Sequence, residues 1–168
     1  MTTLANPSHI RQLSTLRACR AITALTLVLA APLAGAQGAH HLMLEPDKLT
    51  WANVPSLPPG AQIAVIEGPM SEAVPFTIRL KLPANYRIPA HWHPGVERVT
   101  VLSGTFYLGH GDSLDPAKAQ ALPAGSIAIM PAQKRHYAWT TGETVLQLHG
   151  TGPSTITYVN PADDPRKK

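Results

Sequence analysis

Short apolar runs separated by proline and glycine limit most strongly how this chain can fold. Its 168 residues include 17 Pro and 12 Gly, many of them between such runs. Residues 74–82 (VPFTIRLKL) place Phe76, Ile78 and Leu80 at every second position, which is the period of a half-buried strand. No long amphipathic helical segment is available to cover a parallel sheet. The pattern therefore predicts an all-β fold with frequent turns.

Nine segments have strand-like patterns bounded by turn residues. The expected strands cover residues 61–68, 74–82, 86–93, 97–102, 105–108, 126–130, 136–139, 144–149 and 154–159. Residues 103–104 (Ser-Gly) predict a hairpin, and residues 109–123 form one long connection with room for a single helical turn. Short strands with turns about every eight to twelve residues are typical of a sandwich or barrel, so one β-barrel is expected over residues 61–159.

The first 36 residues have the pattern of a secretory signal peptide. Arg11, Arg17 and Arg20 precede an apolar stretch at residues 21–36, which ends in Ala-Gly-Ala. This stretch is shorter than the roughly 20 apolar residues that a membrane-spanning helix needs, so cleavage is favoured over anchoring. The mature protein is therefore expected to be periplasmic or secreted, without membrane attachment.

Removal of this leader changes the charge and leaves no thiol. The chain has 14 Lys and Arg against 10 Asp and Glu, and loss of the three leader arginines leaves 11 against 10. A net charge of +1 without a clustered basic face gives no support for nucleic-acid binding. Cys19 is the only cysteine and lies in the leader. Any metal site in the mature chain must therefore use nitrogen and oxygen ligands.

Three histidines and one glutamate are spaced as the ligands of a single metal. His91 and His93 are two residues apart, and side chains at i and i+2 of a strand point to the same face. Glu97 follows a Pro-Gly turn, and His136 begins a later strand. Such a set suits one divalent transition metal and leaves coordination positions open for a substrate. The alternative is a metal-free barrel in which these side chains hydrogen-bond to one another.

The same residues resemble the two sequence motifs of the cupin superfamily. Residues 91–104 (HWHPGVERVTVLSG) match the first motif, and residues 125–140 (GSIAIMPAQKRHYAWT) are similar to the second. The chain is also similar to small exported cupins and to the cupin domain of ChrR-type anti-sigma proteins. The resemblance implies a single jelly-roll barrel that holds a metal in its wider end through four ligands, His91, His93, Glu97 and His136.

Three positions depart from the cupin motifs. Asn85 and Gln133 stand where the motifs have turn glycines, and Thr140 replaces a closing Asn. Asn tolerates a positive φ, so Asn85 is a mild change, whereas Gln133 predicts a different turn. None of the three positions is a ligand, and the metal site is expected to persist.

The ligand set and the resemblance together favour an exported metalloenzyme for a small oxygenated molecule. Dioxygenase-type chemistry is the leading hypothesis. The alternatives are a metal-dependent isomerase or lyase acting on a sugar acid, and a non-catalytic ligand-binding or sensing barrel. The expected cofactor is one divalent transition metal, Fe or Mn in the first place, with Ni, Co, Cu and Zn as further options. His149 is the candidate acid or base, because imidazole titrates near neutral pH.

Both ends of the mature chain are expected to lie outside the barrel. Residues 37–60 form a lead-in, within which residues 42–51 could join two copies of the chain into a homodimer. Residues 160–168 contain two Pro and five charged side chains and are expected to form a flexible tail.

Overall fold

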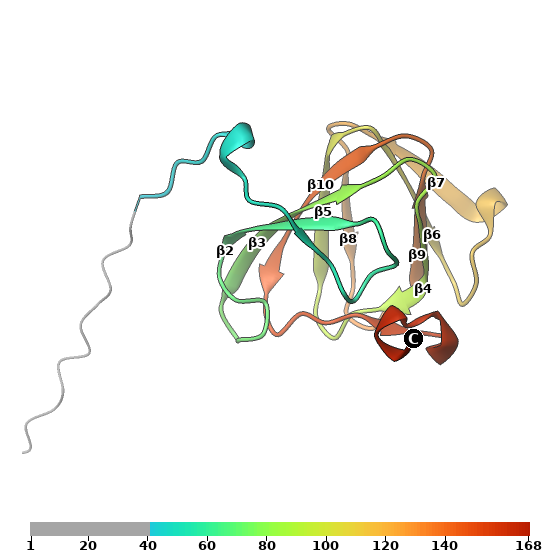
Figure 1. Cartoon of the computed structure of the whole chain (residues 1–168). Coiled ribbons are helices and arrows are strands. Elements are labelled where there is room, and N and C mark those ends of the chain that lie inside the picture. The colour runs from blue at the N-terminus through green and yellow to red at the C-terminus, as the bar shows by residue number, and fades with distance from the viewer. Residues whose placement is uncertain (1–40) are drawn as a thin grey trace, which may run out of the picture. The chain divides into compact units, whose positions relative to one another are not determined.

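Two antiparallel sheets form the part of the chain that the computed structural model describes, residues 41–168 (Figure 1). The first sheet has the strand order β1 (Ala52–Asn53), β2 (Gln62–Glu67), β3 (Pro75–Leu82), β10 (Thr144–Thr151), β5 (Glu97–Ser103) and β8 (Ile127–Met130). The second sheet has the order β11 (Thr157–Tyr158), β4 (Arg87–Trp92), β9 (His136–Thr140), β6 (Thr105–His110) and β7 (Ala119–Pro123). The expected signal peptide lies outside the described residues.

Helical structure within residues 41–168 is confined to four short 3-10 turns. They are η1 (Pro46–Lys48), η2 (Pro116–Lys118), η3 (Pro161–Asp163) and η4 (Pro165–Lys167). Among the described residues there is no helix with the length and hydrophobicity that a membrane span requires. The all-β prediction is therefore confirmed, and the single helical turn expected in residues 109–123 is η2.

Successive strands in the middle of the chain change sheets, as in a jelly roll. β4 and β6 belong to the second sheet, whereas β5 between them pairs with β10 and β8 of the first. The prediction of a hairpin at residues 103–104 is therefore wrong, because β5 and β6 do not pair. Gly104 has φ +77°, and a positive φ serves a corner between sheets as well as a hairpin turn. Among the described strands, hydrogen bonding stays within each sheet and does not close a continuous barrel.

The core lies between the facing sides of the two sheets. β3 shows the predicted alternation, with Ile78, Leu80 and Leu82 buried and the residues between them partly exposed. Each such side chain contributes about 1.5 to 3 kcal/mol when it is removed from water. β7 was not predicted, because its sequence (AQALP) has one buried side chain, Leu122, and ends in Pro. It is an edge strand that pairs only with β6 in the described sheet.

Residues 160–168, expected to form a flexible tail, contain the 3-10 turns η3 and η4 and contact the chain before them. Asp164 is 8% exposed and accepts hydrogen bonds from the guanidinium of Arg166 at 2.8 and 2.9 Å. Arg166 also donates to the carbonyl oxygen of Ile156 at 3.0 Å. The number of charged residues suggested a solvated tail. Instead, two of these charges pair with each other and bind the tail to the strand region before it.

The lead-in contributes one short strand to the first sheet. This strand, β1 at Ala52–Asn53, pairs with β2. Trp51 packs under the ammonium group of Lys81, 4.4 Å from the ring centroid. Leu42, Met43 and Leu44 are exposed, at 59%, 83% and 41%. Pairing of two copies through this segment stays a prediction.

Aromatic side chains cover the outer face of the second sheet. Tyr107 and Trp139 stack with their ring centroids 5.2 Å apart, and Tyr137 continues the row. Tyr137 is fully buried, and its hydroxyl donates to the carbonyl oxygen of Asp115 in the connection that covers it. Gly109 is the partner of Tyr137 across the β6–β9 pair, and a Cβ added there would lie 2.3 Å from the Tyr137 ring. This position therefore requires glycine.

We expect Gly109→Ala to lower the free energy of unfolding by about 1 to 3 kcal/mol, because the buried Tyr137 ring cannot move aside without losing its packing. Gly142→Ala is the matched control, because no atom lies within 4 Å of a Cβ added at that position. Denaturant unfolding of both variants measures the difference. Equal stability of the two variants would contradict the close packing of Gly109 against Tyr137.

Candidate metal centre

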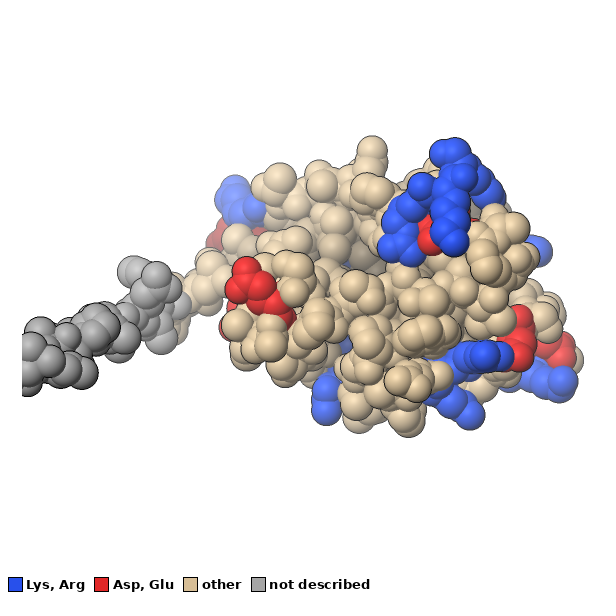
Figure 2. Space-filling model, turned by 90° about the horizontal axis from the view of Figure 1, so that it is seen from below, with Lys and Arg blue, Asp and Glu red and all other residues tan. Residues whose placement is uncertain are grey.

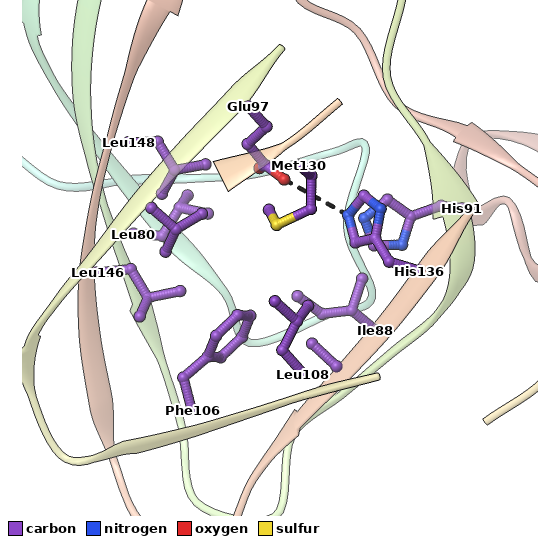
Figure 3. A pocket seen from close by; sticks show the side chains of 12 residues that line it. Leu80, Ile88, His91, Glu97, Phe106, Leu108, Met130, His136, Leu146 and Leu148 are labelled. Atoms are coloured by element: carbon purple, nitrogen blue, oxygen red, sulfur yellow. Dashed lines mark ion pairs between the residues drawn. The ribbon is translucent and has the colours of Figure 1, made fainter. Parts of the chain in front are cut away.

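The four predicted ligands come from both sheets and meet in the interior. His91 on β4 and His136 on β9 are direct partners across the strand pair, and their ring centroids are 4.2 Å apart. His93 follows the end of β4, and Glu97 begins β5 in the first sheet. Glu97 Oε2 lies 3.4 Å from His136 Nε2 and 3.5 Å from His93 Nε2. Figure 3 shows the Glu97 carboxylate directed at the His136 ring.

Backbone carbonyl groups fix the orientation of all three imidazoles. The Nδ1 atoms of His91, His93 and His136 donate to the carbonyl oxygens of Pro89, Thr155 and Lys134 at 2.7, 2.8 and 2.8 Å. A carbonyl oxygen only accepts, so each Nδ1 carries the proton and each Nε2 presents a lone pair. Ligand nitrogens of the three histidines lie within 4.8 Å of one another. The fold therefore directs three nitrogen lone pairs and a carboxylate at one point.

This arrangement suits a positive charge at its centre. His93 Nε2 is buried without a hydrogen-bond partner, an uncommon state for a buried polar atom. In the metal-free alternative, where the side chains satisfy one another, this nitrogen would have a donor. Two atoms each about 2.1 Å from a transition metal lie roughly 3 to 4 Å apart, which matches the distances from Glu97 to His93 and His136. The residues present therefore fit one divalent transition metal.

The protonation states at the cluster suit metal binding. Burial first, and then the neighbouring His136 and His93, lower the pKa of His91 to about 3. Burial alone would raise the pKa of Glu97, but its interaction with the adjacent imidazoles, His136 first, outweighs burial and holds this pKa below its ordinary value. Near neutral pH, His91 is a neutral imidazole and Glu97 a carboxylate, the forms in which both bind metals.

Two cavities adjoin the cluster. The outer cavity has a volume of about 170 Å³ and contacts His91, His93 and Glu97. The inner cavity has a volume of about 30 Å³ and contacts His91, Glu97 and His136 (Figure 3). The outer cavity is otherwise lined by Val54, Ser56, Leu57, Ile63, Met70, Phe76, Ile78, Leu80, Ile88, Leu148, Ser154, Thr155 and Ile156. His91 and Glu97 therefore stand between the two spaces.

His149 is not among these residues. On β10, Leu146 and Leu148 are buried toward the core, and His149 has the opposite parity, beside Thr77 and Arg98 on neighbouring strands. It lies on the outer face of the first sheet and is not placed to move a proton at the cluster. The alternation of Leu146, Gln147, Leu148 and His149 already contained this signal.

Two contributors to the site come from the backbone. The Thr155 carbonyl orients His93, and Gln133 donates its N–H to the carbonyl oxygen of His93 at 2.8 Å. Gln133 adopts the left-handed conformation at φ +61°, as Asn85 does at φ +58°. The backbone of Gln133 thus takes the conformation expected of a glycine, so the expectation of a different turn at this position is not met. Backbone partners carry no side-chain signal, which is why sequence reasoning missed Thr155.

The surface on the side shown in Figure 2 is mostly uncharged. Lys and Arg side chains form separate small groups there, some of them beside Asp or Glu. A continuous basic surface, which a nucleic-acid interface would require, does not cross this face.

A family model described as the ChrR cupin-like domain matches residues 39–155. A search of curated proteins found no significant match.

Several solved structures share the fold. The polyketide cyclase RemF from Streptomyces resistomycificus has a TM-score of 0.61 at 14% identity, with 76% of this chain and 92% of that chain covered. The proposed acetylacetone dioxygenase of Methylibium petroleiphilum PM1 has a TM-score of 0.57 at 18% identity, with 75% and 85% covered. KdgF from Halomonas sp. has a TM-score of 0.53 at 16% identity, with 67% and 96% covered. At these identities the likeness shows a common fold.

We expect the metal-free protein to lose stability as the pH falls from about 6.5 toward about 3. In this range unfolded His91 binds a proton, whereas folded His91 stays neutral, so acid favours the unfolded state. Glu97 acts in the same direction, because its lowered pKa stabilises the fold above pH 4.5 and this contribution is lost as the carboxylate is protonated. Denaturant unfolding at several pH values measures the slope. His91→Gln should flatten it, and an unchanged slope would contradict burial of a neutral imidazole.

Proposed function

The chain belongs to the ChrR cupin-like family, and from this membership and the site geometry we propose that it is an exported mononuclear metalloenzyme of the dioxygenase type. The observation that carries the proposal is the convergence of His91, His93, Glu97 and His136 beneath a neutral, largely apolar cavity. Its substrate is a small uncharged organic molecule with an oxygen donor.

The four side chains would hold one Fe or Mn ion, with Ni, Co, Cu and Zn as further options. A bound ion of this kind supplies Lewis acidity and redox chemistry toward an organic substrate and dioxygen. The chain's own residues supply orientation. The carbonyl groups of Pro89, Thr155 and Lys134 keep the imidazoles directed at the centre, and the apolar walls exclude water from it.

The outer cavity sets the chemical character of the substrate. Ten of its lining side chains are apolar, and within the described part of the chain no Lys or Arg lines it. A carboxylate substrate would be desolvated there with no Lys or Arg to pair with, so the metal ion alone would have to balance its charge. A cavity of about 150 Å³ in another protein binds benzene, so the 170 Å³ cavity suits a compact molecule of similar size. Ser56, Ser154 and Thr155 are available as hydrogen-bond partners.

The same lining argues against an isomerase or lyase for sugar acids. Such a reaction needs a group that moves a proton, and within residues 41–168 the titratable residues that line the two cavities are the four proposed ligands alone. His149 faces the other side of the first sheet. Oxidative cleavage makes less demand on a separate acid or base, and the site therefore favours it. A non-catalytic binding barrel would share the metal and the cavity but show no turnover.

Elemental analysis and oxygen uptake test this proposal together. Protein isolated from the periplasm should contain about one Fe or Mn per chain and consume O₂ with a compact β-diketone such as acetylacetone. His91→Ala and His136→Ala should each lose most of the metal and the O₂ uptake while keeping the fold, because each removes one ligand of four. His149→Ala is the matched control and should keep both properties.

If the metal content is unchanged in both His91→Ala and His136→Ala, these residues do not bind the metal and the proposed site is wrong. Bound metal without O₂ uptake across a panel of neutral diketones and other small oxygenated compounds would favour the binding barrel. Metal-dependent conversion of a uronic acid without O₂ uptake would favour the isomerase.

Export is tested by the mature N-terminus. The Ala-Gly-Ala sequence at residues 34–36 predicts cleavage before Gln37. We expect mass spectrometry of the periplasmic protein to give a chain that starts at Gln37. Recovery of the uncleaved chain in the cytoplasmic fraction would contradict export.

A further inference from the structure

The inner cavity has a different chemistry from the outer one. Nine of the twelve residues that line it are apolar, among them Val99, Phe106, Leu108, Met130 and Leu146. Its three polar lining residues are His91, Glu97 and His136, all members of the cluster. In Figure 3 the apolar side chains surround the space, and the Glu97 carboxylate and the two imidazoles form one side of it. The inner cavity is thus an apolar chamber with a single polar wall.

The metal cluster and three apolar side chains lie between this chamber and the outer cavity. His93 lines only the outer cavity, and His136 lines only the inner chamber. The residues that line both spaces are His91, Glu97, Leu80, Ile88 and Leu148. Two molecules could therefore reach one centre from different sides, one from each space.

Size and polarity restrict what the chamber can hold. Its volume of about 30 Å³ exceeds the roughly 10 to 15 Å³ needed for one very small molecule, but is far below that of an organic substrate. A buried water needs two to four polar partners. The three polar groups here are the proposed metal ligands, whose lone pairs are engaged when a metal is bound, so they are poor partners for a water among the apolar side chains. A small apolar molecule suits such a space better.

We propose that this chamber is a binding site for dioxygen, from which O₂ approaches the cluster while the organic substrate occupies the outer cavity. The inference rests on the proposed dioxygenase function, because a reaction without O₂ gives the chamber no ligand. Binding of O₂ here involves no covalent step, only transfer of an apolar diatomic molecule from water into an apolar space.

Paramagnetic relaxation by dissolved O₂ tests the site directly. The protein is loaded with Zn²⁺, which is diamagnetic, and its methyl groups are followed by NMR under O₂ pressure. Methyl groups of Val99, Leu108, Met130 and Leu146 should show relaxation enhancements several-fold larger than those of Leu82 and Val101. The two control residues are just as buried but line neither cavity. Equal enhancement in the two groups, or enhancement confined to the outer cavity, would overturn the proposal.

A matched pair of variants tests the role of the chamber in turnover. Val99→Ile adds one methyl group to the chamber wall, and Val101→Ile adds one to the same strand outside it. Val99→Ile should raise the KM for O₂ several-fold and leave the KM for the organic substrate unchanged, whereas Val101→Ile should change neither. Equal KM values for O₂ in the two variants would overturn the proposal.

The two experiments separate this inference from the function beneath it. The relaxation measurement needs no turnover and no variant, so it stands even if Val99→Ile fails to fold. If the protein consumes O₂ with substrate but shows no preferential relaxation, the dioxygenase function stands and the O₂ site in the chamber is wrong. If the protein takes up no O₂ with any substrate, both proposals are wrong.

Discussion

The site depends on one electrostatic constraint: three imidazole nitrogens and one carboxylate are directed at a single point. The imidazoles of His91 and His136 lie on strands of the second sheet, and His93 directly follows the end of β4. The carboxylate of Glu97 lies on β5 of the first sheet. Backbone carbonyl groups hold each imidazole so that it cannot turn its N–H inward. A cluster with acceptors only is unfavourable in an apolar interior unless a cation sits among them. The ligand set thus also links the two sheets across the core.

Much of this site could be predicted because strand periodicity and ligand chemistry are both local. The i, i+2 spacing of His91 and His93 follows from the pleat, and Glu97 and His136 begin strands where the sequence predicted them. Tertiary pairing was harder to predict. A glycine at residue 104 permits a positive φ but does not say whether the next strand joins the same sheet. The placement of Thr155 and the pairing of Asp164 with Arg166 likewise depend on chain segments that only the fold brings together.

His149 shows where a residue-type argument fails. An imidazole at a strand end was a reasonable proton carrier, but its alternation with Leu146 and Leu148 turns it to the outer face of the first sheet. Without it, the titratable groups around the cavities are the ligands themselves, and this restricts the chemistry. In the proposed reaction, the two cavities would hold two reactants of unlike size and similar polarity, a compact neutral organic molecule and a diatomic gas.

The coordination shell of the bound metal tests the central claim most directly. X-ray absorption at the metal edge, measured on the purified metal-containing protein, should show three imidazole nitrogens and at least one carboxylate oxygen at about 2.0 to 2.2 Å. His93→Ala should reduce the imidazole count by one. A shell with fewer than two imidazoles, or one that is unchanged in His93→Ala, would contradict the convergence of these side chains on a single ion.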